Sequence, residues 1–183
     1  MLLGVGSGRN FAPLLAAGLE IDAVEENTER AAAASRAFAE FKRVRVLHAP
    51  YRNPVAAAGR YAGVLSTHAL LHGTPALIAE IVTALRRRLA ADGHFFATIG
   101  SKRDARFGRG TCVAPNAFAP TDGDEAGVTH AFFDEAGVRT LFRGFELETI
   151  REESAAGTVG AWAHDPDRAR DVIHWFVRAR RRR

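Results

Sequence analysis

The sequence predicts a three-layer, doubly wound α/β fold, with a mainly parallel sheet of seven strands and one antiparallel strand near the C-terminus. Three observations lead to this prediction. Short apolar segments alternate with segments of helical periodicity along the 183 residues, a pattern typical of parallel strands joined by right-handed crossovers. A glycine-rich loop follows the first apolar segment, as in sheets that bind ligands at their carboxyl edge. The last two apolar segments have no helical pattern between them, so one of these strands is expected to run antiparallel.

The seven expected strands are short runs of mostly apolar residues. They cover residues 1–5, 21–24, 44–47, 61–66, 94–99, 145–150 and 172–177. Residues 154–171, which connect the last two strands, have little apolar periodicity. A long hairpin is therefore expected there.

Four helices are expected where apolar side chains recur every three or four residues. They run from the glycine loop to Gly18, from Thr28 to Phe41, from Thr74 to Asp92-Gly93, and from Asp134 to Gly144. The third has the clearest start, because Thr74 can cap the free amides and Pro75 fits the first helical position. Residues 101–131 are instead interrupted by glycine and proline, and so long an irregular connection is usually functional or mobile.

The composition indicates one domain at residues 1–180, followed by a basic tail at 181–183. The 47% hydrophobic and 25% charged residues are typical of a globular protein. The single cysteine, Cys112, excludes an internal disulfide framework. No signal peptide is recognised, and no apolar run approaches the roughly 20 residues that span a bilayer. We therefore expect a cytoplasmic protein with no membrane partner.

The net charge of +4 comes from the C-terminus, where five arginines stand at positions 178 and 180–183. Without these arginines, 20 basic residues would face 21 acidic ones, a balance of −1. A basic tail can hold nucleic acid by counterion release, or it can be a solvated terminus that favours solubility. The rest of the chain has no stripe of interleaved basic and aromatic residues, so no nucleic-acid partner is expected.

The glycine loop, Gly4-Val5-Gly6-Ser7-Gly8, indicates a small-molecule site. Its glycines allow a tight turn and let the backbone approach a ligand without intervening Cβ atoms. Glu25 ends the second strand, where a carboxylate can accept both hydroxyl hydrogens of a ribose. Dinucleotide loops have the pattern G-x-G-x-x-G, which would need glycine at Arg9. The third glycine is instead Gly8, which disfavours a nicotinamide cofactor; a plain tight turn is the alternative.

Residues 3–10 resemble motif I of class I S-adenosylmethionine-dependent methyltransferases, and residues 23–25 resemble the acidic motif that follows it. Residues 64–72, 89–96 and 174–180 resemble the fourth strand with its loop, the turn into the fifth strand, and the final strand of the tellurite-resistance-type group. This resemblance implies a Rossmann-like methyltransferase fold, S-adenosylmethionine (SAM) as cofactor and a small-molecule acceptor. The cofactor contacts that it implies are Gly4, Gly6, Gly8, Glu25, Glu26, Tyr51 and Thr67.

Three features depart from that family. Leu2 replaces an acidic residue usually found two positions before the first glycine, and Ala49-Pro50 stands where an aspartate often follows the third strand. The chain also begins inside the first strand, so that either its start is truncated or its site is unusually open. These departures keep a second interpretation open, a methyltransferase-like module that binds a ligand or partner without turnover. A nicotinamide-dependent oxidoreductase and an RNA methyltransferase are further alternatives.

Histidines are the candidate catalytic residues, because their pKa suits proton transfer near neutral pH. His130, near the end of the irregular stretch, is the first choice for a substrate-side base, and His68 follows the fourth strand, where the methyl group is expected. Each also has a structural interpretation as an ordinary packed histidine. His72 is expected to bond the backbone in the turn before Thr74.

The segment from Ser101 to Cys112 follows the fifth strand and can fold over a substrate. Its four basic residues can clamp an anionic acceptor, or they can form a solvated loop face. They are Lys102, Arg103, Arg106 and Arg109. No metal site is expected, since one cysteine and scattered histidines offer no tetrahedral ligand spacing.

Overall fold

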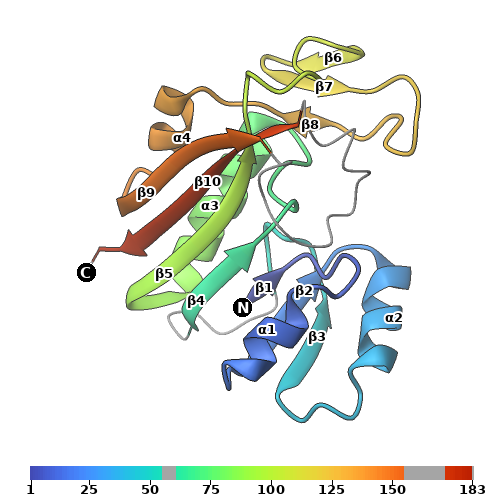
Figure 1. Cartoon of the computed structure of the whole chain (residues 1–183), viewed down its shortest axis with the longest axis vertical. Coiled ribbons are helices and arrows are strands. Elements are labelled where there is room, and N and C mark those ends of the chain that lie inside the picture. The colour runs from blue at the N-terminus through green and yellow to red at the C-terminus, as the bar shows by residue number, and fades with distance from the viewer. Residues whose placement is uncertain (55–60, 155–171, 183) are drawn as a thin grey trace.

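A computed structural model describes residues 1–54, 61–154 and 172–182, so the connection expected at 154–171 lies almost entirely outside the described residues. Its main sheet has seven strands in the order β3-β2-β1-β4-β5-β10-β9 (Figure 1). The strands are β1 (Leu2–Leu3), β2 (Ile21–Glu25), β3 (Val44–His48), β4 (Tyr61–Ser66), β5 (Leu89–Gly100), β9 (Phe145–Ser154) and β10 (Ile173–Arg181). Parallel pairing joins β1 through β5, and β10 is antiparallel to both of its neighbours, β5 and β9. The predicted mainly parallel sheet with one antiparallel strand is confirmed.

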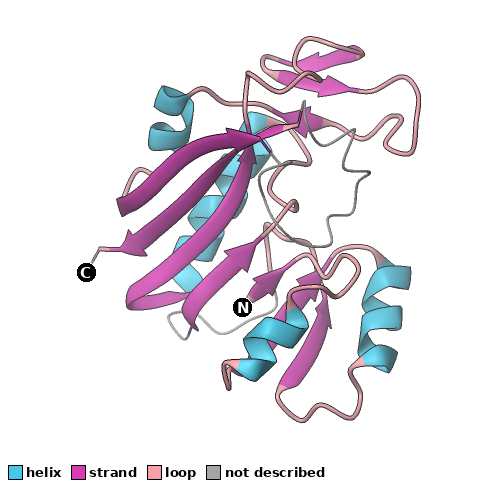
Figure 2. Cartoon of the chain, viewed as in Figure 1, coloured by secondary structure: helices cyan, strands magenta, loops and turns pink. Residues whose placement is uncertain are grey.

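The helices lie on both faces of this sheet (Figure 2). They are α1 (Phe11–Ala16), α2 (Thr28–Ala37), α3 (Pro75–Arg88) and α4 (Glu135–Leu141). Neighbouring residues of a strand point to opposite faces, so the two residues of β1 enter different cores. Leu2 packs in a cluster with residues of α1 and α2, whereas Leu3 belongs to a larger cluster with α3 and α4. The predicted three-layer arrangement is therefore confirmed.

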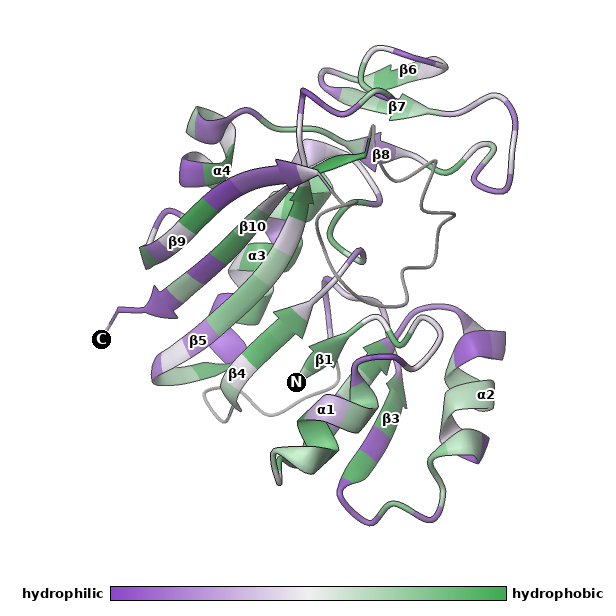
Figure 3. Ribbon diagram, viewed as in Figure 1, coloured by the Kyte–Doolittle hydropathy of each residue, from purple (hydrophilic) through white to green (hydrophobic). Residues whose placement is uncertain are grey.

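The strands differ in polarity across the sheet. Figure 3 shows β1, β2 and β4 as mainly hydrophobic, whereas hydrophilic residues recur along β9 and β10. Arg178 and Arg180 of β10 form ion pairs with Glu148 of β9. This alternation is expected for antiparallel strands with one face in solvent.

Side chains cap three of the four helix starts. Thr74 accepts a hydrogen bond from the Leu77 amide at 3.2 Å, as predicted, and Asn27 and Asp134 cap α2 and α4 in the same way. Capping of this kind satisfies amides that have no partner inside the helix.

Two helices end earlier than predicted. The helix α2 stops at Ala37 rather than Phe41, because Phe38 leaves helical geometry and stacks on Phe11 with 4.0 Å between ring centroids. The helix α3 stops at Arg88, and Asp92-Gly93 lies inside β5 rather than closing the helix. Leu89 is fully buried and already pairs with Tyr61, while Asp92 takes a φ of +61° where the pairing shifts.

Residues 101–131, expected to be irregular, contain a second sheet of three short antiparallel strands. They are β6 (Thr111–Ala114), β7 (Ala117–Ala119) and β8 (His130–Ala131). Backbone hydrogen bonds attach this small sheet to the main one: the Ala131 amide donates to Leu71, and the Phe133 amide donates to Gly100. Figure 1 shows the small sheet beyond the carboxyl ends of β4 and β5. It therefore lies over the edge where the predicted site residues gather.

Among the described residues, no helix has the length and apolar character needed to cross a membrane.

Candidate functional site

A cleft of about 850 Å³ lies at the carboxyl edge of the main sheet. It is lined by the glycine loop, the end of β2, the turn after β4 and parts of the segments 104–106 and 120–125. Its volume is in the range of roughly 300–1,000 Å³ typical of small-molecule sites. A second cavity, of about 570 Å³, lies against α3 and α4; it is lined by Lys102 but by none of the predicted cofactor or catalytic residues.

The glycine loop forms one end of the cleft, which we call the glycine-loop end. Gly4, Gly6 and Gly8 all have positive φ, at +79°, +50° and +85°, a region that side chains rarely adopt. A Cβ on Gly4 would lie 2.9 Å from the Cβ of Ala69, whereas a Cβ on Gly6 would have no neighbour within 4 Å. The predicted tight turn is present, and Gly6 leaves its backbone open to the cleft.

Glu25 holds this loop in place from the end of β2. Its side chain lines the cleft, although only 4% of the residue is exposed. One carboxylate oxygen accepts a hydrogen bond from the Val5 amide at 3.0 Å, and the other accepts one from the Asn27 amide at 2.9 Å. Glu25 thus orders the glycine loop and the segment after β2 through main-chain amides. Each oxygen can accept more than one hydrogen bond, so capacity for a ligand hydroxyl remains.

The other predicted cofactor residues differ in whether they line the cleft. Tyr51 and Thr67 line the cleft, whereas Gly8 and Glu26 do not. Burial, reinforced by the charges of Glu25 and Glu26, raises the pKa of the Tyr51 phenol above its usual range. Glu26 accepts a hydrogen bond from the Tyr51 amide, and Thr67 accepts one from the Asn10 side chain at 2.8 Å. Glu26 therefore positions Tyr51 without lining the cleft itself.

His68 lies in the turn after β4 and lines the cleft. Its φ of +67° is unusual for a residue with a side chain, and such conformations cluster at functional sites. The amide of His68 donates to the Thr98 hydroxyl at 2.8 Å, and its ring meets that of His174 edge to face with 5.0 Å between centroids. Packing and hydrogen bonding thus hold this backbone conformation.

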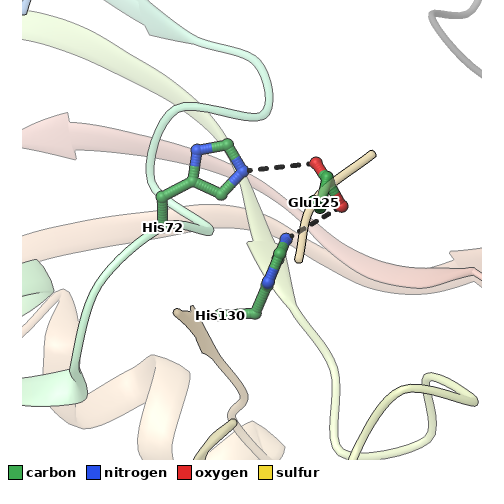
Figure 4. Close-up of side chains that lie close together, drawn as sticks. All are labelled: His72, Glu125 and His130. Atoms are coloured by element: carbon green, nitrogen blue, oxygen red, sulfur yellow. Dashed lines mark ion pairs between the residues drawn. The ribbon is translucent and has the colours of Figure 1, made fainter. Parts of the chain in front are cut away.

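The opposite end of the cleft, which we call the histidine end, contains His72, Glu125 and His130 (Figure 4). Glu125 lies between the two rings: its Oε2 is 3.1 Å from Nε2 of His130, and its Oε1 is 3.7 Å from Nε2 of His72. His130 is only 2% exposed and its Nδ1 lies 2.8 Å from the Val128 carbonyl oxygen. The neighbouring imidazoles of His130 and His72, in that order of effect, hold the pKa of Glu125 far below its usual range, against the opposing effect of burial.

His130 does not itself line the cleft, whereas His72 and Glu125 do. The first-choice catalytic residue therefore has contact with Glu125 rather than a place of its own in the cleft lining. The sequence showed no signal for Glu125, because it lies in a polar segment, residues 122–125, that is typical of a loop. The main-chain amide of His72 donates to the Ala69 carbonyl, whereas its side chain points to Glu125.

The basic residues after β5 are largely neutralised. Lys102 pairs with Asp134 at 2.7 Å, and Arg103 pairs with Glu152 at 3.0 Å. Arg106 lines the cleft but pairs with Asp104 at 2.8 Å and approaches Glu125 at 3.5 Å. These pairs favour a structural role over a four-residue clamp for an anionic acceptor.

Comparison with known proteins identifies which solved structures share this fold. No family model matches the sequence, and no curated protein matches it. Solved structures do match. A SAM-dependent methyltransferase from Methanosarcina mazei superposes with a TM-score of 0.77 and 14% identity, covering 99% of this chain and 91% of that one. The chain has the fold of the SAM-dependent methyltransferases.

Two other matches show the range of this fold. The 1,6-didemethyltoxoflavin-N1-methyltransferase of Burkholderia thailandensis, solved with its substrate and S-adenosylhomocysteine, has a TM-score of 0.68 and 22% identity over all of this chain and 71% of that one. The cyclase SpnF has a TM-score of 0.67 and 16% identity over 99% of this chain and 73% of that one. The fold thus supports more than one reaction, and the site must identify the function.

Proposed function

We propose that this protein transfers the methyl group of SAM to a small-molecule acceptor. The observation that carries this proposal is the Glu25 carboxylate, which lines a cleft of suitable size and holds the glycine loop through the Val5 amide. The sequence resemblance and the fold support the same cofactor. The alternative of a binding module without turnover rests on the departures at Leu2 and Ala49-Pro50.

The glycine-loop end fits the cofactor. Gly6 leaves open space beside the backbone, so a ligand can lie close to it. Glu25 has unused acceptor capacity for ribose hydroxyls, and Tyr51 presents an aromatic side chain in the same cleft. When bound, SAM supplies an electrophilic methyl group for in-line displacement. The residues of the chain then have to align the acceptor with that group and remove its proton.

The histidine end fits the acceptor. His72 and Glu125 face the cleft and offer a nitrogen and a carboxylate to a hydroxyl, amine or carboxyl group. His130 fixes the Glu125 carboxylate from its buried position at 3.1 Å. His68 lines the cleft in the turn after β4, which supports a role beside the path of the methyl group. These side chains are our candidates for orienting and deprotonating the acceptor.

Calorimetric titration with SAM, S-adenosylhomocysteine and NAD tests this proposal. We expect both sulfur compounds to bind and NAD not to bind. Glu25→Gln should weaken S-adenosylhomocysteine binding about 10- to 100-fold, the range for lost hydrogen bonds to a charged group. Glu40→Gln, at an exposed position after α2, is the matched control and should bind normally.

A folded sample that binds neither sulfur compound would contradict the proposed cofactor. Transfer of labelled methyl from SAM to a panel of hydroxyl, amine and carboxyl acceptors then tests turnover. Binding without transfer to any of them would favour the module without turnover.

A further inference from the structure

We propose that His72, Glu125 and His130 bind a divalent transition-metal ion at the histidine end of the cleft. One ligand atom from each residue can be chosen so that all three lie within 4.8 Å of one another. Tetrahedral coordination with bonds of about 2.1 Å separates ligand atoms by about 3.4 Å. Each histidine nitrogen lies near that distance from one oxygen of Glu125: His130 Nε2 is 3.1 Å from Oε2, and His72 Nε2 is 3.7 Å from Oε1.

The hydrogen bonding of His130 favours a cation at this point. Its Nδ1 lies 2.8 Å from the Val128 carbonyl oxygen, and a carbonyl can only accept, so Nδ1 carries a hydrogen. The Nε2 atom of a neutral ring then presents its lone pair to the Glu125 carboxylate, which also only accepts. Nε2 is buried and makes no hydrogen bond of acceptable geometry with the described residues. A proton or a metal ion must therefore lie between these two atoms.

A backbone carbonyl bonded to Nδ1 is also the arrangement that orients histidine ligands in metal sites. It fixes the ring and leaves Nε2 as the ligand atom. Val128 is itself held close to the third ligand, because its amide donates to the Glu125 carbonyl at 2.9 Å. The geometry that orients His130 and the turn that carries Glu125 are thus one structural unit.

The two histidines are held at a fixed spacing by the backbone. His72 and His130 form an antiparallel bridge between the turn after β4 and β8. On either side of this bridge, the Gly73 amide donates to Thr129 at 2.7 Å and the Ala131 amide donates to Leu71 at 2.8 Å. The rings meet edge to face with 5.0 Å between centroids. Two of the three ligands are therefore placed before any ion binds.

Two imidazoles and one carboxylate are typical of transition metals such as Zn²⁺ rather than of Mg²⁺ or Ca²⁺, which prefer oxygen ligands. Three protein ligands leave a fourth position open, and His72 and Glu125 turn the site toward the cleft. Arg106 approaches Glu125 at 3.5 Å, but its charge is shared with Asp104 through two side-chain hydrogen bonds of 2.8 Å. Arg106 therefore neutralises the Glu125 carboxylate only in part, and negative charge is left to attract a metal ion.

A metal ion in this site can bind an oxygen or nitrogen of the acceptor at its open coordination position. The ion would then lower the pKa of that acceptor group. This role in catalysis rests on the proposed function, whereas metal binding itself does not. No metal site was expected from the sequence because the histidines are scattered along it. The structure brings the three residues together from two separate segments of the chain.

Cobalt binding tests the proposal directly. Full-length chain without a histidine tag is stripped with a chelator and titrated with Co²⁺, whose visible absorption reports nitrogen and oxygen ligands in low coordination. We expect one Co²⁺ per chain, displaced by one equivalent of Zn²⁺. His130→Asn and Glu125→Gln should each weaken binding at least about 100-fold, the upper end of what the loss of an outer-shell partner costs.

One further ligand variant and two controls complete this experiment. His72→Asn changes a side chain that is 42% exposed, so it tests the site even if His130→Asn does not fold. His94→Asn removes a histidine of β5 and should leave Co²⁺ binding unchanged. Glu25→Gln should lose S-adenosylhomocysteine affinity and keep Co²⁺ binding.

Absence of 1:1 binding, or binding that persists in all three ligand variants, would overturn the metal site. In that case the cation between His130 and Glu125 is a proton. Unchanged binding of S-adenosylhomocysteine would then show that the proposed cofactor site stands without the metal.

Discussion

The glycine-loop end of the cleft is built from residues close together in the sequence, whereas the histidine end joins residues 72, 125 and 130 across two sheets. At the first end, Glu25 holds the loop through the amide of Val5, only 20 positions away. At the second, the backbone bridge between His72 and His130 spans 58 positions. A site built within one strand–turn–helix unit can thus be recognised from residue spacing in the sequence. A site built by contact between two sheets can be recognised only in the three-dimensional structure.

The largest effect on stability is expected from Gly4→Ala, which should disrupt the glycine-loop end. Gly4→Ala puts a Cβ 2.9 Å from Ala69 and forces a side chain to adopt a φ of +79°. Gly108 has the same φ with nothing within 4 Å, so Gly108→Ala isolates the backbone cost of about 1–2 kcal/mol. We expect Gly4→Ala to lower the free energy of unfolding by about 1–3 kcal/mol more, as in overpacked cores.

Urea unfolding measures both variants, and calorimetry should show that S-adenosylhomocysteine binding is lost only in Gly4→Ala. Equal losses of stability in the two glycine variants would mean that the close approach to Ala69 has no cost. The glycine-loop end would then be less tightly packed than the structure indicates.

A smaller effect is expected from Glu125→Gln, which tests whether the two ends act separately. Turnover should fall about 100-fold, the lower range for loss of a proton-transfer group. Affinity for S-adenosylhomocysteine should stay within about twofold, because Glu125 makes no contact with the glycine loop. Glu80→Gln, on the exposed face of α3, should leave both quantities unchanged.

A Glu125→Gln variant that loses S-adenosylhomocysteine affinity would show instead that the two ends are coupled. Initial rates at saturating SAM, together with calorimetry on the same preparation, distinguish the two outcomes.

The smallest effect is expected from Thr74→Ala at the start of α3. The lost cap bond to the Leu77 amide should lower the free energy of unfolding by about 1 kcal/mol. Thr83→Ala, in the middle of the same helix, should be neutral or slightly stabilising, since alanine favours helix. Because Thr74 follows the Gly73–Thr129 hydrogen bond, hydrogen exchange of the Gly73 amide should also accelerate in the cap variant.

Unchanged exchange at Gly73 in Thr74→Ala would mean that the turn carrying His72 is held by the small sheet alone. The histidine end would then be independent of α3.

The main sheet was predictable because its strands and helices bury side chains at regular intervals. Leu2 and Leu3 illustrate the limit of such local patterns: both are apolar, and only the fold shows that they enter different cores. The end of α3 was misplaced because Leu89 is apolar and fits both a helix and the buried strand that it starts. Such ambiguity is inherent in patterns of a few residues.

The small sheet was not predictable for a different reason. Its strand β8 has only two residues, too few for any periodicity, and it is defined by pairing with β7 and with His72. Glu125 has no strand or helix of its own, so its position depends on that pairing. The glycine loop and Glu25 were recognised together, whereas His130 was found as a single residue without its partners.

The joint between the two sheets has a consequence for how this protein can be varied. Main-chain atoms of residues 71–73 and 129–131 make the connection, so it does not depend on which side chains these residues carry. The exposed residues 121–124, which lie outside this joint, can therefore be exchanged without breaking it. Such an exchange would change what enters the cleft and leave the glycine loop untouched, which gives both evolution and protein engineering a simple way to alter ligand preference.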